Sequence, residues 1–321
     1  MKKEVAIGID IGGTNTVIGV VDREGNLIAE AHTPTLTNTD IKNYLDVLTA
    51  KINETVFELN GDVEVKGIGI GAPSSNYYTG EIVGASNLGW GDVIPFVKLL
   101  QEHYDYPAIV LTNDANSAAV GELMYGGAKS MDNFIMLTLG TGVGSGIVIN
   151  GKLVLGHDGF AGELGHVITD VNGRECGCGR KGCLETYASA TGICRTVSEL
   201  IATTKIPSDL RKVPSGNFTS KMIYDAAVKG DELALEAFEL TGKMLGRAIA
   251  DFVAFSSPEA VFLFGGLAQA GDYIFKPTKK YMEENMCFLY SDKVKLLPSE
   301  LDGAKIAVLG ASAVVWKELE K

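Results

Sequence analysis

At 321 residues, the chain is long enough to form two domains, each with its own hydrophobic core. Its hydrophobic content of 46% and charged content of 21% are those of an ordinary soluble globular protein. The net charge of −12 argues against non-specific binding to nucleic acid or to anionic membranes, because both need a basic surface.

The N-terminal segment and the cysteines predict the compartment. The apolar run before Asp10 is too short for a signal peptide, and no stretch reaches the ~20 apolar residues that a membrane span requires. Apart from one cluster, the cysteines are the isolated Cys194 and Cys287, which suits a reducing environment. We therefore expect a cytoplasmic protein.

Residues 5–32 predict an antiparallel meander of strand, glycine turn, strand, turn and strand. The first turn, Gly-Gly-Thr at 12–14, would let backbone N–H groups approach a phosphate closely, although a plain hairpin turn explains the glycines equally well. Asp10 favours the phosphate interpretation. A carboxylate that ends an apolar strand is costly to bury unless it holds a cation or accepts hydrogen bonds.

Residues 40–125 read as alternating helices and strands. The predicted elements are a helix at 40–59, a strand at 65–71, a long polar loop at 72–92, a helix at 93–103, a strand at 108–112 and a helix at 115–125. Asn113 and Asp114 stand at the end of a strand, where α/β proteins place ligands. Asp114 could equally be a simple N-cap of the helix that follows.

Residues 134–155 repeat the layout of the first meander. A strand at 134–139 leads into a second glycine turn, a strand at 147–150, the hairpin signal Asn150-Gly151 and a strand at 152–155. We interpret this as a weak internal duplication that yields two similar lobes. A dinucleotide-binding fingerprint is excluded because a β-branched strand, rather than a helix, follows the glycines.

Three cysteines, Cys176, Cys178 and Cys183, lie within eight positions, and His166 lies ten residues upstream. A Cys₃His set is a common ligand set of tetrahedral zinc, and the intervening glycines allow the chain to bend around an ion. The alternatives are buried free thiols or a disulfide, and a disulfide does not suit a chain without a secretory signal. We expect zinc here.

The remainder of the chain is predicted to be mostly helical, with a third glycine turn at 265–271. Its predicted elements are helices at 185–200, 219–229 and 231–255, a strand at 261–264, a helix at 272–285, strands at 294–297 and 305–309, and a helix from 311. Residues 201–218 are predicted to form an irregular segment with few residues suited to catalysis or binding.

The run Gly-Glu-x-Gly-His at 162–166, with Cys-x-Cys-Gly-x-x-Gly-Cys-Leu-Glu at 176–185, resembles the signature of the ROK family of repressors and sugar kinases, most closely its bacterial glucokinases. This implies a two-lobed, actin-like (ribonuclease H-like) α/β fold with ATP and sugar in the cleft between the lobes. Residues 1–113, completed by a helix at 311–321, would form the small lobe. Residues 114–310 would form the large lobe with the zinc segment, the nucleotide loops and a dimer surface.

The resemblance also implies a site for transfer of a phosphoryl group from ATP to the 6-hydroxyl of glucose, with Asp114 as the general base. The sugar-binding residues that it implies are Asn87, Asn113, Glu163, His166 and Glu185. The residues implied for ATP and Mg²⁺ are Asp10, Gly12, Gly13, Thr14, Gly140, Thr141, Gly142, Gly265 and Gly266. Structural zinc would be held by His166, Cys176, Cys178 and Cys183.

The resemblance leaves the sugar open. The family often has a glycine at the position of Ser74, in a loop beside the sugar, so fructose, N-acetylmannosamine, N-acetylglucosamine and allose remain alternatives to glucose. A homodimer without nucleic-acid or membrane partners is implied. The rival from another class is a sugar-responsive repressor, which needs an N-terminal helix-turn-helix. The first strand begins at Val5, which leaves no room for one.

Overall fold

The computed structural model describes residues 2–85, 88–214, 216–301, 303 and 305–321. Its contacts divide the chain into two compact units. Unit 1 comprises residues 1–131, 146–162 and 300–321, and unit 2 comprises residues 132–145 and 163–299. The sequence-based division after residue 113 differs from this grouping because helix α3 (Asp114–Tyr125) packs against the C-terminal helix α9 (Ile306–Leu319) of unit 1.

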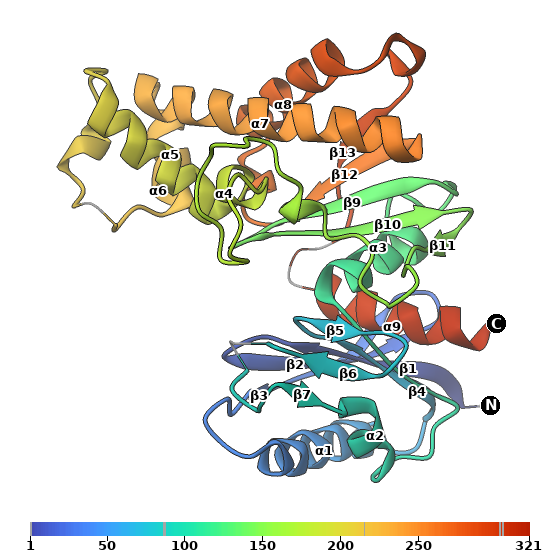
Figure 1. Cartoon of the computed structure of the whole chain (residues 1–321). Helices are drawn as coiled ribbons and strands as arrows, with labels where there is room; N and C mark the ends of the chain where they lie inside the picture. The colour runs from blue at the N-terminus through green and yellow to red at the C-terminus, as the bar shows by residue number, and fades with distance from the viewer. Residues whose placement is uncertain (1, 86–87, 215, 302, 304) are drawn as a thin grey trace. The chain divides into compact units, whose positions relative to one another are not determined.

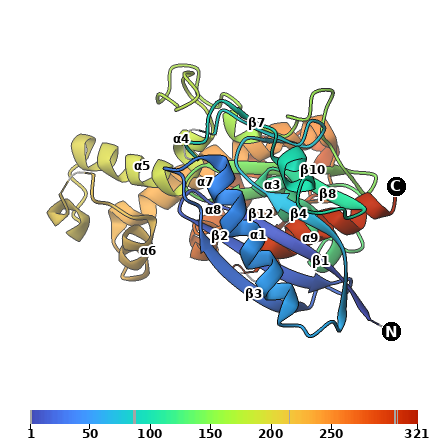
Figure 2. The same cartoon turned by 90° about the horizontal axis from the view of Figure 1, so that it is seen from below.

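The sheet of unit 1 confirms the predicted N-terminal meander. Its order is β3-β2-β1-β4-β8, in which β1, β2 and β3 are antiparallel while β1, β4 and β8 are parallel. The strands are β1 (Lys3–Ile11), β2 (Asn15–Asp22), β3 (Leu27–Pro34), β4 (Val63–Gly71) and β8 (Ala108–Thr112). Helices α1 (Ile41–Phe57) and α9 lie on opposite faces of this sheet (Figure 1), and Figure 2 shows α1 lying across its strands.

The second sheet has the same connectivity, which confirms the predicted duplication. Its order is β11-β10-β9-β12-β13, with β9, β12 and β13 parallel. The strands are β9 (Phe134–Leu139), β10 (Val143–Ile149), β11 (Lys152–Leu153), β12 (Ala260–Phe264) and β13 (Lys295–Pro298). Strand β10 runs from unit 2 into unit 1.

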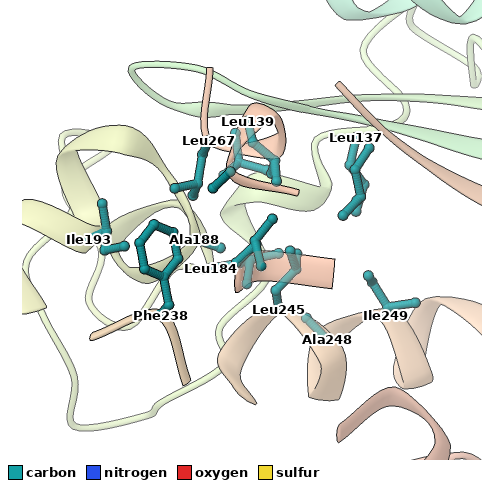
Figure 3. Close-up of a cluster of buried hydrophobic side chains, with 14 of the residues drawn as sticks. Leu137, Leu139, Leu184, Ala188, Ile193, Phe238, Leu245, Ala248, Ile249 and Leu267 are labelled. Atoms are coloured by element: carbon teal, nitrogen blue, oxygen red, sulfur yellow. The ribbon is translucent and has the colours of Figure 1, made fainter. Parts of the chain in front are cut away.

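Helices cover the part of this sheet that belongs to unit 2. They are α4 (Glu185–Ala188), α5 (Ala190–Thr203), α6 (Ser220–Val228), α7 (Glu232–Ser256) and α8 (Asp272–Asn285). Leu137 and Leu139 of β9 meet Leu245 and Ile249 of α7 in the buried core of this unit (Figure 3). The α/β class that the sequence predicts is therefore confirmed. Within the described residues, no helix combines the length and the apolar character needed to cross a membrane.

Three predicted elements are corrected by the structure. The strand expected at 305–309 is the first turn of α9, because a short apolar run does not distinguish a strand from a buried helix. The single helix expected at 185–200 breaks at Ser189, whose side chain caps α5 by accepting from the N–H of Gly192. The loop expected at 72–92 contains short strands at Ser75–Asn76 and Glu81–Val83, which pair into a small sheet with β7 (Val93–Ile94).

Glycines in the sheet of unit 1 allow α9 to lie directly on the backbone of the strands. A Cβ atom at Gly8 would come within 2.0 Å of the carbonyl oxygen of Val308, and one at Gly69 within 1.9 Å of that of Ala311. This contact explains the alternation of glycine with isoleucine in β4. The isoleucines face the buried cluster on the side of α1, and Gly67 and Gly69 face α9.

We expect Gly69→Ala to lower the free energy of unfolding by about 3 kcal/mol or more, because backbone atoms of α9 cannot move aside as a flexible side chain would. Urea unfolding followed by circular dichroism measures this change. Gly266→Ala is the control, since a Cβ atom there meets nothing within 4 Å. Equal stability of the two variants would contradict the close packing of α9.

Candidate functional site

In unit 1, the carboxyl ends of three parallel strands bring the predicted acidic residues together. The register of the sheet pairs Asp10 of β1 with Gly71 of β4, and Gly71 with Thr112 of β8. Asn113 and Asp114 follow Thr112 directly, and a Cβ atom at Gly71 would lie 3.8 Å from the Cα atom of Asp114. Asp10 and Asp114 therefore occupy the same edge of the sheet.

The N-cap of α3 is Asn113 rather than Asp114. The side-chain oxygen of Asn113 accepts from the N–H of Asn116 at 2.7 Å. Asp114 is the first helical residue, and its Oδ1 atom accepts from the N–H of Ala115 at 2.8 Å. The capping explanation of Asp114 is thus wrong. Asn113 keeps its NH₂ group for donation, because the cap uses its oxygen.

Both carboxyl groups have a raised pKa. Burial raises the pKa of Asp10 from 3.8 to about 6, and the neighbouring charge of Asp114 contributes to this shift. Desolvation also raises the pKa of Asp114, although hydrogen bonds from backbone N–H groups oppose it. Asp114 is exposed to solvent, so its carboxyl group can exchange a proton. Paired, desolvated carboxyl groups are typical of functional sites.

The glycine turn at 12–14 is held from one side. Thr35 binds it twice, donating its hydroxyl to the carbonyl of Gly12 at 2.7 Å and its N–H to the carbonyl of Thr14 at 3.0 Å. Gly13 and Thr14 are exposed. Gly12 does not have a positive φ, so the turn itself does not demand glycine there. Because Gly13 and Thr14 are exposed, a ligand can approach the backbone of this turn.

In unit 2, Glu185 is joined directly to the second glycine turn. Its Oε2 atom accepts from the N–H of Val143 at 3.0 Å. A Cβ atom at Gly142 would lie 2.1 Å from the same oxygen, so only glycine leaves room for this carboxylate. A Cβ atom at Gly140 would meet nothing within 4 Å, and Thr141 beside it is exposed. One predicted sugar-binding residue therefore supports one predicted phosphate loop.

The four predicted zinc ligands lie together. The ligand atoms of His166, Cys176, Cys178 and Cys183 are all within 4.8 Å of one another. The distance from Cys178 Sγ to Cys183 Sγ is 3.6 Å, and that from Cys176 Sγ to His166 Nδ1 is 3.7 Å. The edges of a tetrahedral zinc site measure about 3.6–3.8 Å, from bond lengths of ~2.0–2.3 Å. The cysteines are free thiols, and their arrangement fits a zinc ion.

Local interactions favour the thiolate at Cys178, whereas burial raises the pKa of Cys176 and Cys183. Hydrogen bonds from the backbone and then from the side chain of Arg180 lower the pKa of Cys178 to about 6, which favours the thiolate that metals bind. Arg180 also donates to the carbonyl oxygen of His166 at 2.6 Å. Because Nδ1 of His166 faces Cys176, the Nε2 atom is left for another partner.

The predicted sugar-binding residues of unit 2 lie around the same cluster. Cys176 Sγ lies 3.8 Å from Oε1 of Glu185, so Cys176 contacts both His166 and Glu185. Glu163 is exposed and precedes the turn of 3-10 helix at Leu164–His166, and its carbonyl oxygen accepts from the N–H of His166 at 3.1 Å. Asn87 lies outside the described residues.

The third glycine turn borders a hollow that the sequence did not reveal. Gly265 has a φ of 102°, which favours glycine, while the surroundings of Gly266 are open. The hollow beside Gly266 is also lined by Ser220 and Tyr224. A second hollow lies beside Thr141, and its lining includes Gly216, Phe218 and Ser220. Gly216 and Phe218, at the end of the segment predicted to be irregular, therefore line a hollow beside the second glycine turn. No sequence motif predicted this position.

Ser74, where the sequence resemblance led us to expect a glycine, has a backbone conformation that favours glycine. Its φ of 52° lies in the left-handed region, where a residue with a Cβ atom is strained. Its carbonyl oxygen accepts from the N–H of Val83 at 3.0 Å, which ties the loop into the small sheet. The serine therefore keeps the glycine-like backbone.

Comparisons with known proteins identify the family. A sequence profile of the ROK family matches residues 6–318. The chain is 36% identical to the glucokinase of Halalkalibacterium halodurans, over 96% of this chain and 92% of that protein. It is 28% identical to the xylose repressor of Bacillus subtilis, over 98% and 77%. The crystal structure of a ROK family glucokinase from Streptomyces griseus in complex with glucose and AMPPNP matches with a TM-score of 0.78 and 30% identity, over 98% of this chain and 99% of that one.

The raised pKa of Asp10 predicts that this carboxylate lowers stability at neutral pH. Because its pKa is higher in the folded state than in the unfolded state, stability decreases as the pH rises from the ordinary value of 3.8 through about 6. We expect Asp10→Asn to increase the free energy of unfolding at pH 7.5, by at most about 3 kcal/mol, and to give much less gain at pH 4.5.

Urea unfolding at both pH values measures this difference. Asp105→Asn is a matched control, because Asp105 is an exposed aspartate of the same unit. A gain that does not depend on pH would contradict the assignment.

Proposed function

The chain belongs to the ROK family, and we propose that it is an ATP-dependent hexokinase that phosphorylates the 6-hydroxyl of glucose. The glucokinase relatives support a sugar kinase. The observation that carries the proposal is Asp114: it begins α3 without capping it, and its carboxyl group is desolvated on the strand edge that also holds Asp10.

Asp114 is the proposed general base. Transfer of a phosphoryl group requires the sugar hydroxyl to lose its proton as it attacks, and a carboxylate within reach can accept that proton. A pKa raised towards the working pH makes Asp114 a stronger base than an ordinary aspartate. The bond from the Ala115 N–H to Oδ1 orients the carboxylate, and Oδ2 is the oxygen left to take the proton.

The glycine turns are proposed to bind the triphosphate. Backbone N–H groups and the hydroxyls of Thr14 and Thr141 would cradle the phosphates, and the turn at Gly265 and Gly266 would face the adenosine. Mg²⁺, when bound, neutralises phosphate charge, and Asp10 would hold it, through water where the ion keeps its hydration. The match to a structure in complex with AMPPNP supports nucleotide binding.

The sugar is proposed to be bound by carboxylates and amides. Glu163 and Glu185 would accept hydrogen bonds from sugar hydroxyls, and the NH₂ group of Asn113 would donate one. His166 would donate from Nε2 while Nδ1 belongs to the cysteine cluster. Four protein ligands would leave a bound zinc ion no open position, so its role would be structural. A homodimer is proposed from the family resemblance alone.

The substrate is tested with an assay of ADP release from Mg-ATP across glucose, fructose, allose, N-acetylmannosamine and N-acetylglucosamine. We expect the highest kcat/KM for glucose and a loss of about 10²–10⁴-fold in kcat for Asp114→Asn, because the base is removed. Asp105→Asn, which changes an exposed aspartate of unit 1, serves as the control.

A higher kcat/KM for another sugar would change the assigned substrate but leave the proposed mechanism unchanged. Turnover of no sugar would refute the kinase and favour a sugar-responsive regulator. If Asp114→Asn retains more than about a tenth of kcat, Asp114 is not the base.

We also expect one zinc ion per chain in the purified protein, measured by mass spectrometry of the metal content. Cys178→Ser should lose the zinc and lower the melting temperature, because one of the four ligands is removed. Cys287→Ser should retain it, since Cys287 is exposed and is not part of the cluster. Stable native protein without any zinc would show that the thiols have another role.

A further inference from the structure

Arg174 makes an unusually complete set of hydrogen bonds at the start of the cysteine hairpin, residues 174–183. Its Nε and Nη2 atoms bind the two carboxylate oxygens of Glu199 at 2.8 and 2.6 Å. Nη1 donates to the carbonyl oxygens of Thr186 and Gly192 at 2.7 and 3.1 Å, and Nη2 donates to Thr196 Oγ1 at 2.9 Å. Since a guanidinium has five N–H donors, all of them are used.

The same arginine holds Tyr187 in two ways. Its guanidinium lies over the ring of Tyr187, 4.4 Å from the centroid. Its backbone N–H donates to the hydroxyl of Tyr187 at 3.1 Å, and that hydroxyl lies 3.1 Å from Oδ2 of Asp170, to which it can donate. Thr186 and Tyr187 are the two residues that follow Glu185 in the four-residue helix α4.

Arg174 also belongs to the backbone of the hairpin that carries the cysteines. Its carbonyl oxygen accepts from the N–H of Gly182 at 2.8 Å, next to Cys183. Residues Glu175 and Lys181 form a β-bridge one step further along. The arginine therefore connects the cysteine hairpin to α4 and to the first turns of α5.

The contacts of Arg174 with α4 affect Glu185, because Glu185 is the first residue of that helix. The other side of α4 is fixed by Leu184 and Ala188, which point into the buried core (Figure 3). A four-residue helix has little stability of its own, so its orientation depends on contacts of this kind. The side chain of Arg174 is only 8% exposed and that of Glu199 is 56% exposed, so the guanidinium of this ion pair is buried while its carboxylate faces solvent.

We propose that Arg174 is a positioning residue for sugar binding, which sets the orientation of Glu185 relative to the cysteine cluster. The proposal rests on the assignment of Glu185 to the sugar in the proposed function. Arg174 contacts neither the sugar nor the metal in this role. It acts through Thr186, Tyr187 and the hairpin backbone.

The test compares Arg174→Met and Arg174→Lys with Arg211→Met. Arg211 is a control because its guanidinium also binds backbone carbonyls, in its case the three of Ile201, Thr204 and Ile206, away from α4. Glucose affinity is measured by calorimetry without ATP, and KM for glucose, KM for ATP and kcat by turnover. The absorption spectrum of the cobalt-substituted protein reports the geometry of the cysteine cluster.

We expect Arg174→Met to weaken glucose binding about 10–100-fold and to alter the cobalt spectrum, with KM for ATP unchanged. Arg174→Lys should have effects between those of the wild type and Arg174→Met, because lysine keeps the positive charge but loses the bidentate pairing with Glu199. Arg211→Met should change neither the glucose affinity nor the cobalt spectrum. If Arg174→Met does not fold, the lysine variant provides the same comparison.

Lower stability with unchanged glucose affinity and an unchanged cobalt spectrum would overturn the proposal, because Arg174 would then be structural only. The calorimetric and cobalt measurements do not need turnover. If the wild type binds glucose without phosphorylating it, the kinase proposal fails while the role of Arg174 is still decided. If the wild type binds none of the sugars in the panel, the assignment of Glu185 fails, and the positioning proposal fails with it.

Discussion

The arrangement of unit 1 depends on the close approach of α9 to the backbone of the sheet. Gly8 and Gly69 admit the helix from one side, and Gly310 of α9 allows α3 to approach from the other, since a Cβ atom there would lie 2.3 Å from the carbonyl oxygen of Ser117. Asp10 ends a strand in this stack and Asp114 begins a helix in it. Their separation is therefore set by contacts between backbones, which vary less than contacts between long side chains.

Unit 2 fixes its candidate site differently. Its candidate residues lie on turns and on a very short helix, and polar contacts hold them: Glu185 to Val143, Arg174 to α4 and α5, and the cysteine cluster to His166. A metal ion would add a rigid centre to a segment that has little regular structure. The two units therefore hold their candidate residues differently, unit 1 by backbone packing and unit 2 by polar contacts, to which a bound metal ion would add.

The parts of the fold and site that the sequence predicts are those with a local signal. Strand and turn patterns located both meanders, and the Cys₃His spacing located a cluster whose ligand atoms meet. The start of α9 was mistaken because its apolar run is compatible with both a strand and a buried helix. The cap of α3, the hollow beside Thr141 and the contacts of Arg174 depend on residues distant in sequence or on backbone geometry, which no motif encodes.

The raised pKa values of Asp10 and Asp114 connect the fold to the proposed chemistry. A folded protein gains nothing in stability from two desolvated carboxyl groups on one strand edge, because burial opposes the ionisation of both and the charge of Asp114 opposes that of Asp10. Their retention is explained if a cation and a transferable proton come with the substrates. Mg²⁺ near Asp10 would offset the repulsion, and a sugar hydroxyl near Asp114 would use the stronger base. The local cost to stability is then the source of the reactivity.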